Sequence, residues 1–182
     1  MSKLINISNK KAQVWVETVI YTLIAFVLIG AVLAFVKPKI EELQDRTIIE
    51  QSLEMLETID SEILSVVQGG AGGKRIVNIG LKKGELELNC SGDMLIFRIE
   101  SGYLYSELDT QTNIGDIIAL TESDGKYNKV SLTSNYSERY NITYRFKEEL
   151  KTIQKATTPY KLIITNEGGQ EGKKLNINLD VA

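Results

Sequence analysis

The chain begins with one long hydrophobic segment that differs from everything after it. From Lys10 to Val36 the sequence reads KKAQVWVETVIYTLIAFVLIGAVLAFV, and no side chain between Thr18 and Val36 carries a charge. At about 1.5 Å per residue, a helix of this length crosses a hydrocarbon core about 30 Å thick. A carboxylate inside such a helix is costly in lipid and usually has a partner or a function. The pattern therefore predicts a membrane-spanning helix, in which the early acid Glu17 either has such a role or lies at the level of the lipid headgroups.

A second helical pattern follows Pro38. Proline removes a helical hydrogen bond and disfavours helix at the residue before it, but the periodicity resumes at once, so we expect a kink near Pro38 and not an end. Residues 39–68 are amphipathic. Their apolar stripe contains Ile49, Leu53, Leu56, Ile63 and Val67, widened by Ile40, Leu43, Ile48 and Ile59, and the remaining surface carries Glu41, Glu42, Asp45, Glu50, Glu54, Glu57, Asp60 and Glu62. This pattern fits a helix docked on its own domain, a helix that packs against neighbouring subunits, or both along different lengths.

The glycine-rich run at residues 69–73 ends the helical pattern, because glycine costs about 1 kcal/mol per residue inside a helix. No strand precedes the run and no Lys-Ser or Lys-Thr follows it, so we interpret it as a flexible joint and not as a phosphate-binding loop.

After Lys74 the period changes to that of strands. Turn residues separate the short runs, which predicts an antiparallel, β-sandwich-like head over residues 74–182 and an α+β fold class for the whole chain. The expected strands are 75–81, 85–90, 94–100, 103–107, 114–121, 129–136, 141–146, 160–166 and 174–181. Lys82-Lys83-Gly84 is expected to close a hairpin between the first two, and residues 147–153 to form a helical turn or an extended charged loop.

Charge and residue usage narrow the function. The chain has a formal net charge of −3, no histidine and one cysteine, Cys90. An acidic chain without a basic cluster argues against nucleic acid as a partner. The lack of histidine removes histidine-based triads and zinc sites, and we find no nucleophile motif, so no enzyme activity, metal or cofactor is predicted. Cys90 is interpreted as a small buried hydrophobe.

The segment Lys10-Lys11-Ala12-Gln13-Val14-Trp15-Val16-Glu17 resembles the class III signal peptide of archaeal type IV pilins. That resemblance covers roughly the first forty residues, and Trp15 departs from it where many members carry serine. It implies cleavage between Ala12 and Gln13 by a prepilin peptidase that recognises Lys10 and Lys11. Residues 1–12 would then be a leader and 13–68 a long helix, with 13–36 in the membrane or filament core.

The resemblance also implies a function. The chain would be a major or minor structural subunit of an archaeal type IV pilus-like surface filament, held first in the cytoplasmic membrane with its N-terminus inside. The basic leader favours that orientation. Glu17 would pair with the new amine on Gln13 of a neighbouring subunit during assembly. Expected partners are copies of the chain or other pilins, the peptidase and, indirectly, an assembly ATPase and a platform protein. The alternative is a membrane-anchored extracellular β-sandwich binding module, or a fixed component of such a machine.

Three Asn-X-Ser/Thr triplets lie in the expected head. They begin at Asn89, Asn135 and Asn141 and are candidate N-glycosylation sites, compatible with an external domain.

Overall fold

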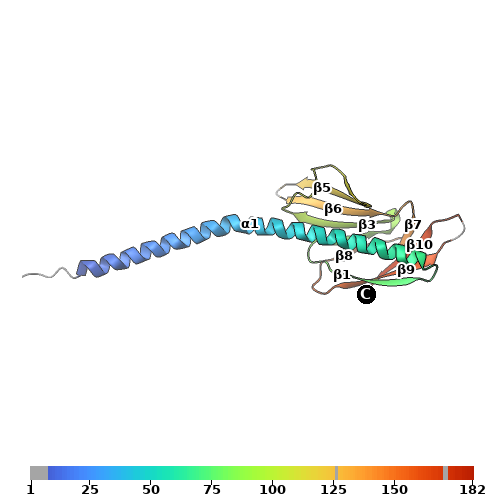
Figure 1. Ribbon diagram of the computed structural model, residues 1–182, viewed down its shortest axis with the longest axis horizontal. Helices are drawn as coiled ribbons and strands as arrows, with labels where there is room; N and C mark the ends of the chain where they lie inside the picture. Colours follow the sequence, from blue (N-terminus) through green and yellow to red (C-terminus); the bar gives the residue numbers. More distant parts are fainter. Residues whose placement is uncertain (1–7, 126, 170–171) are drawn as a thin grey trace, which may run out of the picture. The chain divides into compact units, whose positions relative to one another are not determined.

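The structure is a computed structural model that describes residues 8–125, 127–169 and 172–182, with side chains described from Val14 onward. One long helix is followed by a β-rich head, so the predicted α+β class is confirmed (Figure 1). The elements are α1 (Ser8–Gln68), β1 (Lys74–Ile79), β2 (Glu85–Asn89), the short 3₁₀ helix η1 (Cys90–Gly92), β3 (Met94–Ser101), β4 (Thr112–Ile114), β5 (Ile117–Asp124), β6 (Tyr127–Asn135), β7 (Tyr140–Tyr144), β8 (Leu150–Gln154), β9 (Tyr160–Gly168) and β10 (Leu175–Val181).

The helix α1 is 61 residues long and continues through Pro38. The chain nevertheless divides into two compact units between Glu41 and Glu42. The unit boundary therefore falls inside α1, whereas the sequence placed it at the glycine run. The reason is that residues 42–68 of the helix have a hydrophobic face that packs into the same core as the strands.

The buried face of α1 in the second unit follows a regular spacing of three and four residues. It contains Asp45, Ile49, Ser52, Leu56, Ile59, Ile63 and Val66, and all of these belong to the buried interior of the head. The predicted stripe was therefore partly right. Leu53 and Val67 lie at its partly buried edges, and Ile40 and Leu43 are exposed. Two polar residues, Asp45 and Ser52, occupy buried positions that the apolar pattern could not reveal.

Two sheets share one hydrophobic core with this helix face. One sheet has the strand order β1-β9-β10-β7 and the other β4-β5-β6-β3-β2-β8. The pairs are antiparallel except for β7 with β10, which run parallel. Alternating burial along β6, as in Val130 and Leu132, places every second side chain in the core. The head is thus a two-sheet sandwich closed in part by its own helix.

Several predicted strands were wrong in detail. Strands β1 and β2 do not form a hairpin, because β1 pairs with β9 and β2 pairs with β3 and β8 in the other sheet. The expected strand 114–121 is divided by a turn into β4 and β5. Part of segment 147–153 forms the edge strand β8, because pairing with β2 overrides its charged local composition.

Segment 103–107 is a loop and not a strand. Two of its backbone donors bond to side chains in place of a ladder: Tyr103 N–H donates to Ser101 Oγ (2.8 Å) and Ser106 N–H to Thr121 Oγ1 (3.1 Å). These bonds compete with strand pairing at both ends of the segment.

The glycine run is held in place by hydrogen bonds, which corrects its interpretation as a flexible joint. Gly72 N–H donates to the carbonyl of Asn166 (2.7 Å), and Asn166 N–H donates to the carbonyl of Gly73 (2.9 Å). Gly70 and Gly72 have φ values of +84° and +83°, which side chains disfavour. The run is therefore a fixed turn from α1 into β1.

Candidate functional site

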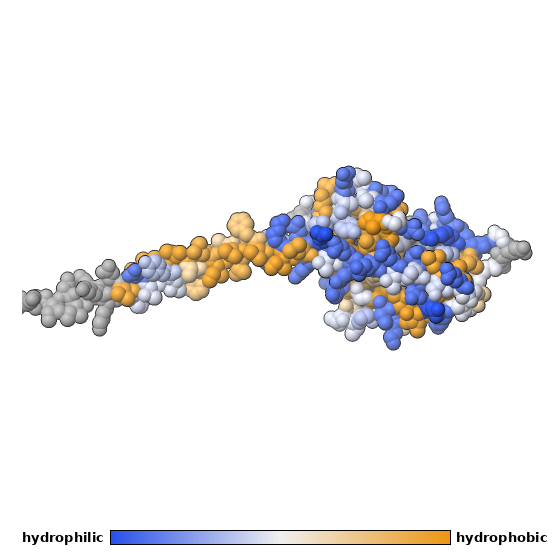
Figure 2. All heavy atoms as spheres, in the orientation of Figure 1, coloured by the Kyte–Doolittle hydropathy of each residue, from blue (hydrophilic) through white to orange (hydrophobic). Residues whose placement is uncertain are grey.

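The first candidate site is the apolar part of α1. Large side chains from Val14 to Val36 are exposed, from 41% at Val19 to 79% at Phe35. Figure 2 shows this surface as almost continuously hydrophobic. Among the described residues this is the one helix long and apolar enough to cross a membrane, judged by length and composition. Large exposed apolar patches mark contacts with lipid or with other proteins, which makes this segment a candidate for either.

Glu17 lies on a polar patch at the start of this segment. Tyr21, one turn further on, donates its hydroxyl to Oε1 of Glu17 (3.1 Å). Thr18 and Thr22 donate their hydroxyls to the carbonyls four residues before them, at 2.9 and 2.8 Å. Within the side chains described from Val14 onward, Tyr21 is thus the hydrogen-bond partner of this carboxylate. Sequence reasoning missed Tyr21, although the spacing of four residues on a helix indicates the contact.

The structure describes the other predicted processing residues by their backbone alone. Lys10, Lys11, Ala12 and Gln13 lie in the first turns of α1, but their side chains lie outside the described residues, as does the start of the leader. Cleavage between Ala12 and Gln13 stays a prediction.

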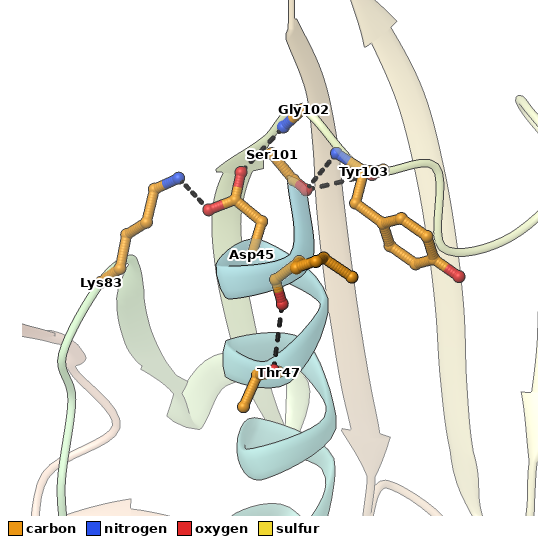
Figure 3. Close-up of polar contacts among 7 residues, drawn as sticks. Asp45, Thr47, Lys83, Ser101, Gly102 and Tyr103 are labelled. Atoms are coloured by element: carbon orange, nitrogen blue, oxygen red, sulfur yellow. Dashed lines mark hydrogen bonds and ion pairs between the residues drawn. The ribbon is translucent and has the colours of Figure 1, made fainter. Parts of the chain in front are cut away.

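The second candidate site is a polar clamp at the start of the head unit. Asp45, only 6% exposed, forms an ion pair with Lys83 from the β1–β2 connection. Its other carboxylate oxygen accepts a hydrogen bond from Gly102 N–H (2.9 Å), just after β3 (Figure 3). The Asp45 side chain on α1 thus holds two loops, the β1–β2 connection at Lys83 and the turn at Gly102 that follows β3. Bonds to a charged acceptor are stronger than neutral ones, so the clamp fixes the helix against the sheets.

Two tyrosines, Tyr103 and Tyr105, lie near Arg46, the residue after Asp45. The Arg46 guanidinium lies 5.7 Å from the centre of the Tyr103 ring, and its Nε donates to Glu50 Oε1 (2.9 Å). The hydrogen bond to Glu50 raises the pKa of Arg46. Tyr105, in edge contact with Tyr103, has a pKa raised by burial. These contacts attach the loop after β3 to α1.

The three sequons differ in their surroundings. Asn89 caps η1 by accepting a hydrogen bond from Gly92 N–H (3.2 Å), and Asn141 donates through Nδ2 to Asn176 Oδ1 (3.0 Å). Asn135 is exposed, and its Oδ1 accepts from Ser137 N–H (2.9 Å) in a tight turn. Of the three sequon asparagines, Asn135 therefore has the side-chain nitrogen, Nδ2, that is best placed for glycosylation.

Cys90 is 2% exposed and packs in the core, which confirms its interpretation as a small buried hydrophobe. Burial raises the pKa of its thiol to about 11. Among the described residues no group of three or more His, Cys, Asp or Glu side chains converges as a metal site would require.

Comparison with known proteins finds no matching family model, no matching curated protein and no matching solved structure.

Proposed function

We propose that the chain is a structural subunit, major or minor, of a type IV pilus-like surface filament, assembled through its N-terminal helix after leader cleavage. The observation that carries the proposal is an uncharged, exposed helical surface that begins beside one carboxylate. A membrane covers such a surface in the monomer, and the same helices of neighbouring subunits cover it in a filament. When each contact rotates the next subunit by an angle that does not close a ring, the repeated contact builds an open helical filament.

The head supports this proposal because it needs nothing from the apolar segment for its own core. Residues 42–68 complete that core, and residues before 42 form a separate compact unit. The apolar segment is therefore available for contacts between molecules. In this proposal the head lies outside the cell and forms the filament surface.

Glu17 provides the specific test. Inside a filament its carboxylate would meet the amine of Gln13 on a neighbour. Loss of one partner from a buried ion pair costs about 3–5 kcal/mol. In the membrane the same residue lies near the end of the helix, where the headgroup region tolerates it. Glu17→Ala should therefore leave expression, processing and membrane insertion near normal and make filaments scarce or absent.

Matched variants sharpen the experiment. Glu17→Gln keeps the shape and should show a weaker defect, and Glu54→Ala removes an acid from the exposed face of the same helix and should assemble normally. The readouts are electron microscopy of sheared filaments, immunoblots of membranes, and N-terminal sequencing, which should begin at Gln13. Normal filament numbers in Glu17→Ala cells would refute assembly through this acid and favour a fixed, membrane-anchored binding module.

A further inference from the structure

The turn between β7 and β8 holds two residues with side chains in a conformation that normally requires glycine. Tyr144 and Lys147 exchange both of their backbone hydrogen bonds, at 2.9 and 3.0 Å, so Arg145 and Phe146 are the two central residues of a tight turn. Their φ values are +50° and +64°. Turns with positive φ at both central positions favour Asn-Gly or Gly-Gly, because a Cβ disfavours the left-handed region. Arginine and phenylalanine therefore occupy this turn at a cost to the fold.

Side chains of β10 hold this turn in place. Asn178 Oδ1 accepts a hydrogen bond from Phe146 N–H (2.8 Å), and Asp180 Oδ1 accepts one from Arg145 Nε (2.7 Å). The Phe146 side chain gains little burial from this arrangement within its own head, since the residue is 73% exposed. Strained backbone segments cluster at functional sites, and a rigidly held, exposed aromatic side chain suits an anchor in a contact with another molecule.

The head also has a pocket that suits one aromatic side chain. It lies beside α1, and its volume of about 310 Å³ is at the small end of binding pockets. Leu64 of α1 lines it and is 38% exposed, which provides an accessible apolar wall. Its charged lining is mostly acidic and consists of Glu57, Asp60, Asp116 and Arg139. The pocket therefore combines an apolar wall with an acidic rim.

The charges next to Phe146 complement that rim. The residues on either side of it, Arg145 and Lys147, are both cations. Arg145 is paired with Asp180 and Lys147 with Glu149 (3.2 Å), but all four side chains are at least 40% exposed. Exposed ion pairs of this kind contribute little, so both cations remain available to the carboxylates of a neighbouring molecule. An aromatic side chain between two cations thus matches the pocket in both polarity and charge.

The turn and the pocket lie at the same end of the six-stranded sheet. Strand pairing places Leu150 opposite Asn89, Asn89 opposite Met94 and Met94 opposite Asn135, so these residues form one row across the sheet. Leu150 begins β8, four residues after Phe146, and Asn135 lines the pocket. Phe146 itself is not part of the lining of its own pocket. Copies placed side by side in the same orientation therefore bring the turn of one to the level of the pocket of the next.

We propose that Phe146 of one copy inserts into the pocket beside Leu64 of a neighbouring copy, with Arg145 and Lys147 against the acidic rim. The inference rests on the proposed function, because it names a contact between the heads of adjacent filament subunits. The two surfaces differ, so the contact is heterologous and can repeat from subunit to subunit without closing.

Cross-linking in cells that express the full chain tests this contact. A chain with both Phe146→Cys and Ser61→Cys has one thiol at the turn and one on the pocket lining. A short bis-maleimide should join successive copies into a ladder of dimers, trimers and larger species on a denaturing gel of sheared filaments and of membranes. Each single-cysteine chain should stay monomeric, and Cys90 should not react because it is buried.

Matched variants separate the contact from a role in folding. In the double-cysteine chain Lys147→Glu should lower the cross-linked fraction about three- to tenfold, whereas Lys161→Glu, which reverses an exposed charge on the other sheet, should not. In the otherwise wild-type chain Phe146→Gly should keep or raise the melting temperature, since glycine adopts positive φ freely, and yet reduce filament numbers. Ile76→Ala removes a side chain that is 60% exposed elsewhere on the head and should leave filament numbers unchanged.

Three cross-linking results would overturn the proposal: no ladder from the double-cysteine chain, dimers of equal yield from Phe146→Cys alone, or equal cross-linking of the Lys147→Glu and Lys161→Glu chains. A lower melting temperature for Phe146→Gly would also overturn it, because it would assign the residue to folding. Wild-type cells without filaments would refute the proposed function, and the ladder in their membranes would still decide the contact.

Discussion

Replacing Asp45 by alanine should destabilise the head more than the removal of so small a side chain suggests. Asp45 is the one side chain that accepts a bond from Gly102 and also pairs with Lys83. Its own side chain is 8% exposed, whereas that of Lys83 is 42% exposed. After the substitution Lys83 regains water easily, and the N–H of Gly102 loses the acceptor of a partly buried hydrogen bond.

The magnitude follows from those exposures. A hydrogen bond to a charged group contributes about 1.5–3 kcal/mol, and a half-exposed ion pair adds at most about 1 kcal/mol. Asp45→Ala should therefore cost about 2–4 kcal/mol and lower the melting temperature by roughly 10 °C for a unit of this size. Lys83→Met should cost less, about 1–2 kcal/mol, because it leaves the Gly102 bond intact although the 8% exposed Asp45 side chain loses its cation. Asp45→Asn should fall between them.

The assay is thermal and urea unfolding of the full chain in detergent, followed by near-UV circular dichroism, with amide hydrogen exchange at Gly102 as the local readout. Exchange at Gly102 should become fast in Asp45→Ala and stay slow in Lys83→Met. Glu54→Ala, on the exposed face of the same helix, is the control and should change stability by less than about 0.5 kcal/mol. A larger loss in Lys83→Met than in Asp45→Ala would refute the reasoning.

Two further predictions concern the core. A polypeptide of residues 74–182 should fail to fold, because Ile49, Leu56, Ile59 and Ile63 of α1 are fully buried in the sandwich. Residues 42–182 should instead give the dispersed NMR spectrum of a folded protein. A folded 74–182 fragment would contradict the core described above. Cys90 should resist a thiol reagent at pH 8 until the chain unfolds, since its thiol is buried with a pKa of about 11. Because that pKa is raised above the ordinary 9.0, the thiol stabilises the fold below pH 9, and this contribution is lost as the pH rises through about 11. Urea titrations of wild type and Cys90→Ala at pH 8 and 11 would measure the difference.

The sequence by itself determined the elements whose cause is local or periodic. The uncharged run from Thr18 to Val36 specifies an exposed apolar helix whatever follows it. Its length and composition alone predict that it lies in an apolar environment. The change of period after Lys74 specified strands, and most of them lie within a few residues of the predicted bounds. The resemblance of the first residues to a class III leader is also purely a property of sequence.

Only the tertiary structure decided which parts belong together. Asp45 looked like one more acid on a solvated face, and it is buried because Lys83 and Gly102, distant in the sequence, meet it there. The partition of β1 and β2 into different sheets and the formation of β8 depend on strand pairings between distant segments, which local propensity does not encode. Local pattern fixes what each segment is, and burial against the others fixes what each side chain does.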